Sequence, residues 1–231
     1  MELRKLTQEE LRGILELHKL WLESNGKEGK RADLSYCDLT NVNLSYTDLT
    51  NVNLTNAKLF YAYLRDANLS YCDLSYANLF NSNLRDANLT NANLINAKLS
   101  YADLRDANLS YCNLSYANLS YTDLYKTNLF NTNLRYADLR YAYLRNAELT
   151  YADLYKTDLF YAKVDNMIGI NNVGNENRTV YYFYKEDRVM CGCFDNTLEE
   201  FKKAVKEKYG SDYGSYKKCI KLFEMYDSQS H

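Results

Sequence analysis

The sequence predicts an all-β solenoid with a smaller segment at each end. Leucine stands at every fifth position from Leu34 to Leu159, and Val164 closes the series. The residue two before each leucine is nearly always small, as at Ala32 and Cys37, and the other three positions of each block are mostly polar or tyrosine. A five-residue step gives neither a helical stripe nor a constant strand face. The backbone must therefore turn regularly around an axis filled with leucine.

The repeated blocks resemble a known family signature. Ala67–Tyr71 (ANLSY) and Ala102–Asp106 (ADLRD) are similar to the A(D/N)LXX motif of the pentapeptide-repeat family, over about 133 residues. The resemblance implies a right-handed quadrilateral β-helix with four blocks per coil. The sequence agrees, because Arg-Asp-Ala-Asn-Leu begins at Arg65, Arg85 and Arg105, twenty residues apart. Other echoes fall ten or thirty residues apart, so repetition supports four-block winding without proving it.

The N-terminal segment, residues 1–30, is predicted to be a capping helix followed by a turn. Thr7 and Glu10 form a capping-box pattern in a helix expected from residue 1 to about residue 25. Its apolar face is expected to cover the first coil, since a solenoid leaves unpaired strand edges at its ends. That face comprises Leu11, Ile14, Leu15, His18, Leu20, Trp21 and Leu22. His18 and Trp21 admit a ligand-site interpretation, but packing is the simpler one.

Within the repeat block, residues 31–164, equivalent outward positions should form columns from coil to coil. The candidate partner surface comprises Tyr101, Tyr121, Tyr141 and Tyr161 in one column, and Arg65, Arg85 and Arg105 beside Asp66, Asp86 and Asp106 in another. For the tyrosines, a structural ladder of stacked rings is favoured over a partner-binding surface. For the charged columns, mutual neutralisation is favoured, because exposed ion pairs contribute little.

The repeat ends at residue 164, and residues 165–231 are predicted to form a different, smaller α+β unit. Ile168–Asn175 is interpreted as an exit loop, and Thr179–Tyr184 with Val189–Phe194 as a β-hairpin. Two helices follow, from Thr197 to about Tyr209 and from Ser215 to about Tyr226. This unit resembles appendages of other pentapeptide-repeat proteins. The resemblance implies a cap at the far end and leaves open a homodimer through the C-terminal segment.

The sequence offers little catalytic or metal-binding chemistry. Cys37, Cys72 and Cys112 occupy the small inward position, so packing is their expected role. Cys191, Cys193 and Cys219 could assemble three sulfurs, but a clear fourth ligand is missing, so neither a metal nor another cofactor is predicted. The two histidines, His18 and His231, make a histidine-based nucleophile or general base improbable. A non-enzymatic protein is therefore expected.

Charge and hydropathy limit the classes of function that the sequence allows. The formal net charge is −2, and no apolar run approaches the roughly twenty residues needed to cross a bilayer, so a soluble cytoplasmic protein is expected. The main hypothesis is a rigid protein-interaction or structural module whose partner is a protein of unknown identity. The alternative, implied by quinolone-resistance members of the family, is a DNA-mimicking modulator of DNA gyrase or topoisomerase. Residues 31–163 hold twelve Lys/Arg and thirteen Asp/Glu, which disfavours both strong mimicry and direct nucleic-acid binding.

Overall fold

The chain forms two compact units. The computed structural model describes residues 3–165, 167–173, 178–184, 187–191, 194–210 and 214–227. The first unit extends to Val164 and the second begins at Asp165. Each is described here by itself.

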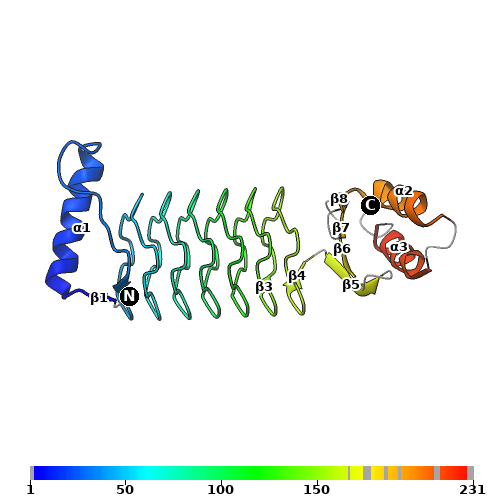
Figure 1. Cartoon of the computed structure of the whole chain (residues 1–231), viewed down its shortest axis with the longest axis horizontal. Helices are drawn as coiled ribbons and strands as arrows, with labels where there is room; N and C mark the ends of the chain where they lie inside the picture. Colours follow the sequence, from blue (N-terminus) through cyan, green and yellow to red (C-terminus); the bar gives the residue numbers. More distant parts are fainter. Residues whose placement is uncertain are drawn as a thin grey trace. The chain divides into compact units, whose positions relative to one another are not determined.

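The first unit contains a stack of coils (Figure 1). Parallel bridges join residues twenty apart, from Asp33 with Asn53 to Asp138 with Asp158. Most pairings are single bridges, and the named strands β2 (Cys37–Asp38), β3 (Tyr143–Leu144) and β4 (Lys163–Val164) are only two residues long. Four pentapeptides therefore make one coil, and the stacked coils form a β-helix solenoid.

Each pentapeptide ends in a tight turn with a left-handed residue. Every fifth residue from Tyr36 to Tyr161 has a φ between 52° and 64°. Asn and Asp adopt this backbone region more readily than other non-glycine residues, yet tyrosine holds half of these positions here and lysine holds two. The Asn or Asp that precedes most of the leucines supports the turn, as where the Ser35 N–H donates to Asp33 Oδ1 over 3.1 Å. This side-chain support explains why Asn and Asp recur at the position before leucine.

The axis of the coils is filled by leucine and small side chains. Leu104 is fully buried, and most of the alanines in the small position, such as Ala97 and Ala102, are buried as well. Cys37, Cys72 and Cys112 are buried in the same position, which confirms the prediction that they pack as small apolar residues. The Cys72 thiol donates to the Leu49 carbonyl over 2.9 Å. Burial raises the pKa of the Cys72 and Cys112 thiols to about 12, so both stay protonated at neutral pH.

The N-terminal segment differs from the single helix predicted. Strand β1 (Arg4–Lys5) comes first and pairs in parallel with β2, and helix α1 (Gln8–Glu23) follows. The predicted capping box of Thr7 and Glu10 is present. The prediction that the helix begins at residue 1 is wrong, because the open edge of the first coil draws residues 4 and 5 into an extended conformation.

Helix α1 lies against the first coil through a narrow contact. His18 is the α1 residue that is fully buried, while most of the predicted apolar face is half-exposed and Leu20 is exposed. The His18 Nδ1 accepts the Ala32 N–H over 3.2 Å, and its ring stacks on Trp21 with centroids 5.7 Å apart. These contacts agree with packing as the role of both side chains.

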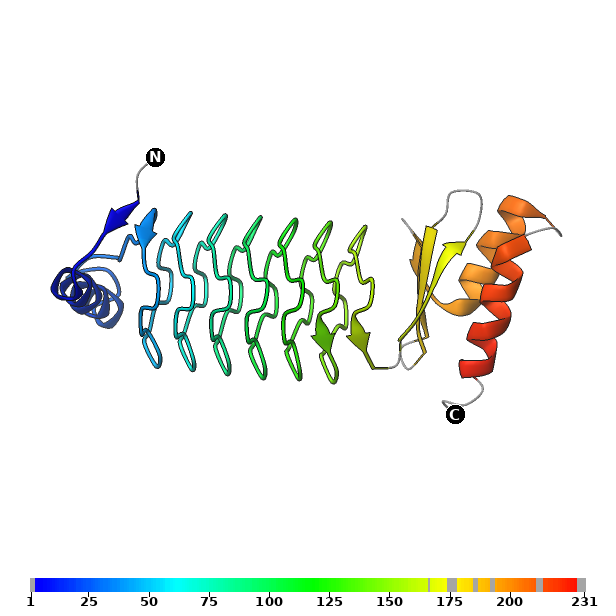
Figure 2. The same ribbon diagram turned by 90° about the horizontal axis from the view of Figure 1, so that it is seen from below.

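The second unit is a four-stranded antiparallel sheet with two helices on one face (Figure 2). Its elements are β5 (Met167–Val173), β6 (Arg178–Phe183), β7 (Arg188–Cys191), β8 (Phe194–Asn196), α2 (Leu198–Tyr209) and α3 (Gly214–Asp227). The strands pair in sequence order, and β6 with β7 makes a hairpin. Buried side chains from the sheet and both helices form one core, in which Tyr182 meets Phe223 with ring centroids 4.9 Å apart.

The exit loop predicted for residues 168–175 is wrong over most of its length. Residues 167–173 form strand β5, which pairs with β6 through Ile168 with Tyr182 and Ile170 with Val180. Residues 174 and 175 lie outside the described part of the chain. Gly and Asn have low strand propensity, which hid the strand in the sequence, and pairing with β6 overrides that propensity.

Candidate functional site

The predicted tyrosine column is a ladder of exposed, stacked rings. Centroids are 4.9 Å apart for Tyr101 and Tyr121, 4.8 Å for Tyr121 and Tyr141, and 5.2 Å for Tyr141 and Tyr161. The first two pairs are almost parallel, with interplanar angles of 1° and 4°. Each of these tyrosine residues is nevertheless 43–65% exposed. Stacking fixes the rings in place and leaves their outer edges free for contact.

Phenylalanines extend this column in a way that the sequence analysis missed. Phe80 makes edge contacts with Tyr101 at 5.5 Å and with Tyr61 at 6.1 Å, across the position where Asn81 interrupts the tyrosines. Phe60 contacts Phe80 at 6.2 Å. The signal was available, because Phe60 and Phe80 are also twenty residues apart. Phe160 contacts Tyr141 and Tyr161 in the same way at the other end. We call the full set the aromatic column: Phe60, Tyr61, Phe80, Tyr101, Tyr121, Tyr141, Phe160 and Tyr161.

A second group of rings lies across the neighbouring face of the coils. Tyr116 and Tyr136 stack at 4.8 Å, and Tyr136 meets Tyr155 edge-on at 5.5 Å. The Arg135 guanidinium lies 4.4 Å from the Tyr155 ring centroid, within the range of a cation–π contact. A shallow groove of about 370 Å³ runs between Phe80 on one side and Tyr116 on the other, with asparagines and Lys98 along it. Aromatic side chains thus flank a polar floor.

The Arg and Asp columns pair with each other. Arg65 lies 3.2 Å from Asp66 and 3.3 Å from Asp86, so it bridges two coils. Arg85 repeats this one coil later, at 3.4 Å from Asp86 and 3.6 Å from Asp106. The charges therefore neutralise one another along the corner. Such half-exposed pairs add little stability, and they leave small net charge for a partner.

Arg105 departs from this pattern. Its guanidinium donates to Asp103 by two bonds, including 2.8 Å from Nε, and also lies 3.5 Å from Asp123. Partial burial would raise the pKa of Asp103, but the hydrogen bonds from Arg105 outweigh it and hold the pKa below its usual value. Arg105 thus pairs with Asp103 by a bidentate fork, whereas Arg65 and Arg85 each pair with the aspartate that follows them.

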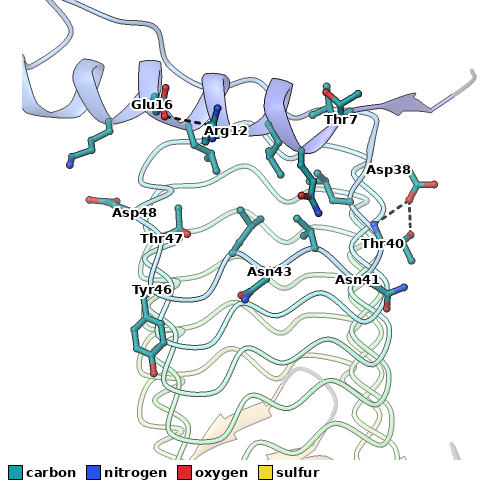
Figure 3. Close-up of a pocket in the computed structure, with 18 of the residues that line it drawn as sticks. Thr7, Arg12, Glu16, Asp38, Thr40, Asn41, Asn43, Tyr46, Thr47 and Asp48 are labelled. Atoms are coloured by element: carbon teal, nitrogen blue, oxygen red, sulfur yellow. Dashed lines mark hydrogen bonds and ion pairs between the residues drawn. The ribbon is translucent and has the colours of Figure 1, made fainter.

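A larger groove of about 980 Å³ lies between α1 and the first coil (Figure 3). Leu11 and Leu15 of α1 line one side of it, and Val42 and Leu44 of the coil line the other. The sequence gives no sign of this groove, because the whole apolar face of the helix was predicted to be covered.

The described residues hold no group of three or more His, Cys, Asp or Glu side chains arranged to bind a metal. Cys191 and Cys219 are both buried in the core of the second unit, and burial raises the pKa of the Cys219 thiol to about 12. Cys193, the third member of the predicted sulfur set, lies outside the described residues. Within the described part of the chain, no helix has the length and apolar character of a membrane span.

Comparisons with known proteins agree with the repeat geometry. The family model for pentapeptide repeats matches eight copies, over residues 32–124 and 127–160. Among solved structures, HetL, a pentapeptide repeat protein involved in heterocyst differentiation regulation from the cyanobacterium Nostoc sp. strain PCC 7120, is 34% identical. The match covers 58% of this chain and 72% of HetL, with a TM-score of 0.32.

Two further structures are more distant. Rfr23 from the cyanobacterium Cyanothece 51142 is 26% identical over 64% of this chain and 93% of its own, with a TM-score of 0.27. QnrB1, a plasmid-mediated fluoroquinolone resistance protein, is 20% identical over 55% of this chain and 81% of its own, also with a TM-score of 0.27. No curated protein matches the chain. Since the family model covers more than half of the sequence and the coils repeat every twenty residues, the chain belongs to the pentapeptide repeat family.

Proposed function

We propose that the coil unit is a rigid protein-binding module and that the aromatic column is its contact surface. The observation that carries this proposal is the tyrosine ladder, whose rings stack with centroids 4.8–5.2 Å apart while the residues stay 43–65% exposed. Rings held by their neighbours lose little conformational entropy on binding, and tyrosine is among the residues that dominate protein interfaces.

Several features of the chain fit a binding role better than a catalytic one. We infer first that the protein is not an enzyme, and that it acts in the cytoplasm. We also infer that the coils wind right-handed as a quadrilateral β-helix. Residues 1–30 and 165–231 are then the caps at its ends. The first inference is supported by the regular coil surface, which repeats Asn, Ser, Thr and Tyr side chains and pairs its Arg with Asp. The contacts of β1 and α1 with the first coil support a cap at that end.

The surface charges favour an ordinary protein partner over mimicry of DNA. A mimic needs a sustained excess of negative charge where its target would meet phosphate. Here Arg65 and Arg85 each bridge two aspartates, and the formal balance of the repeat block is close to zero. A supercoiling assay with purified gyrase is expected to show no effect. Inhibition at sub-micromolar protein that is reversed by salt would establish mimicry instead.

The tyrosine column can be tested directly. The double variant Tyr121→Ser, Tyr141→Ser should weaken a captured protein partner by about tenfold or more, the loss typical of central aromatic contacts. Partners would be captured with the wild-type protein and their affinity for each variant measured by titration. Tyr71 and Tyr76 are exposed corner tyrosines with similar backbone conformation and no ring contact to a described residue. The matched variant Tyr71→Ser, Tyr76→Ser should bind like wild type, and equal loss in both variants would remove the column from the proposal.

A further inference from the structure

The main-chain pairing of the coils stops at the edge of the first coil. In later coils, the residue before each leucine donates its N–H to the coil on its N-terminal side, as Tyr63 donates to the Val42 carbonyl over 2.8 Å. Asn43 and Asp48 hold this position in the first coil, and no described residue pairs with either N–H. These N–H groups therefore point away from the stack at an open strand edge.

Strand β1 shows that this edge accepts an added strand. Arg4 pairs with Cys37 and Lys5 with Asp38, in parallel, and the Arg4 N–H donates to the Tyr36 carbonyl over 2.8 Å. β1 covers only this side of the coil, because the chain then turns into α1. The two sides that follow along the coil carry Asn43 and Asp48.

The groove beside α1 provides the space for a second added strand. It has a volume of about 980 Å³, at the upper end of the range of about 300–1,000 Å³ usual for ligand clefts. Figure 3 shows α1 above the coil with side chains from both entering the gap. Asn43 and Asp48 line the groove, and the half-buried Leu11, Leu15 and Val42 supply its apolar walls. An extended backbone placed here would meet hydrogen-bonding groups on one side and leucines on the other.

The charges around the groove indicate what the segment should carry. The charged side chains that line it are Arg12, Glu16, Lys19, Glu23, Asp38 and Asp48, an acidic excess. Asp38 already has a cation, since Lys58 one coil further on lies 3.3 Å from it. Asp48 forms no ion pair with a described residue. A lysine one coil before Asp48 would make the equivalent contact.

We propose that the open edge of the first coil binds an extended segment of another polypeptide by strand addition. Small and leucine side chains of the segment alternate toward the coil axis, and a lysine lies beside Asp48. Main-chain bonds to Asn43 and Asp48 supply the alignment, as in other cases of strand addition. This site is separate from the aromatic column and does not depend on it.

A synthetic peptide with the sequence of residues 91–100, NANLINAKLS, is a suitable probe. In register with residues 41–50, it places Leu94 beside Leu44 and Lys98 beside Asp48. Binding of the labelled peptide to the full chain would be followed by fluorescence anisotropy, and amide hydrogen exchange would locate it. We expect the exchange of the Asn43 and Asp48 amides to slow by about tenfold or more at saturation, because both become hydrogen-bonded.

Matched variants separate the groove from the rest of the helix. Leu15→Arg fills the groove and should abolish binding, whereas Leu17→Arg, at a position 49% exposed outside the groove, should bind like wild type. Asp48→Asn should weaken binding, and a peptide with Ala97→Pro, which disrupts the extended pairing, should bind poorly. Tyr121→Ser with Tyr141→Ser should leave peptide binding unchanged.

Three outcomes would overturn the proposal. The first is no change in anisotropy at millimolar peptide, and the second is equal binding to the Leu15→Arg and Leu17→Arg proteins. The third is slow exchange of Asn43 and Asp48 in the free protein that speeds up on dilution, which would identify a second copy of this chain as the occupant.

Discussion

The coil unit and the C-terminal unit bury their apolar side chains in opposite ways. In the coils, each leucine packs among equivalent residues one coil away, and the same bridge recurs every twenty residues. In the second unit, Val173 and Val180 share a core with Phe223, so distant parts of that unit depend on one another. The difference teaches that damage should stay local in the coils, as in other repeat proteins, and spread through the whole second unit.

The largest expected effect is in the second unit. Phe223→Ala should cost about 3–5 kcal/mol of unfolding free energy, because the fully buried ring leaves a cavity. Hydrogen exchange in increasing denaturant should show residues of β6, β7 and α2 losing protection together, while the coils keep theirs. Lys221→Ala, at an exposed position of the same helix, is the control. Loss of protection in the coils as well would contradict the comparison.

A core change in the coils should have a somewhat smaller and more local effect. Leu104→Ala should cost about 3 kcal/mol, and faster exchange should be confined to the coil of Leu104 and its two neighbours. The amides of Leu84 and Asp123, which bond to the same coil, would report it. An even loss from residue 32 to 164 would show that the coils unfold as one unit and would break the distinction.

Corner positions should be sensitive to backbone conformation and insensitive to side-chain chemistry. Asn91 is exposed and has a φ of 60°, so Asn91→Val should cost about 1–2 kcal/mol of stability. Asn91→Gly should be close to neutral, since glycine adopts this region freely. The free energies of both variants would come from denaturant titration, and equal costs would mean that the corner is not the cause.

The smallest expected effect is on the stability of α1, whose buried His18 helps to hold the helix against the first coil. Burial lowers the pKa of His18 despite the nearby Asp48 carboxylate, while Arg31 lowers it further. The unfolded chain therefore binds a proton more readily, and stability should fall as the pH drops below about 6.5, the unfolded pKa, toward the lower folded pKa. Protonation also removes the Nδ1 acceptor of the Ala32 N–H.

Amide exchange of α1 at pH 7.5 and 5.0 would test this. α1 should exchange faster relative to the coils at the lower pH, after correction for the intrinsic rate. In His18→Gln the pH dependence should disappear. Unchanged pH dependence in that variant would assign the effect to another group.

The sequence predicted the features that recur in every coil. It did not predict features that occur once and depend on a single contact elsewhere in the fold. The five-residue spacing placed Leu104 and Cys72 in the core, and the twenty-residue echo predicted the stacked tyrosines. β1 was missed because a two-residue strand has no pattern of its own, and only the coil edge makes it extended. The column pattern placed Arg105 beside Asp106 and gave no sign that Arg105 would bind Asp103 by two bonds. Which aspartate an arginine pairs with depends on distances between side chains, and the spacing of residues in the sequence does not give these distances.

The left-handed corners have a consequence for how this surface can change. Each corner presents one side chain per coil, and neighbouring rings in the tyrosine ladder lie 4.8–5.2 Å apart. Tyrosine, asparagine, aspartate and lysine all adopt the same backbone conformation at the corners. The backbone therefore determines where a corner side chain lies, and the residue type determines only its chemistry. The outside of the coils is thus a grid of side-chain positions with constant spacing. Substitutions at the corner positions can give a new row of functional groups while the backbone stays the same.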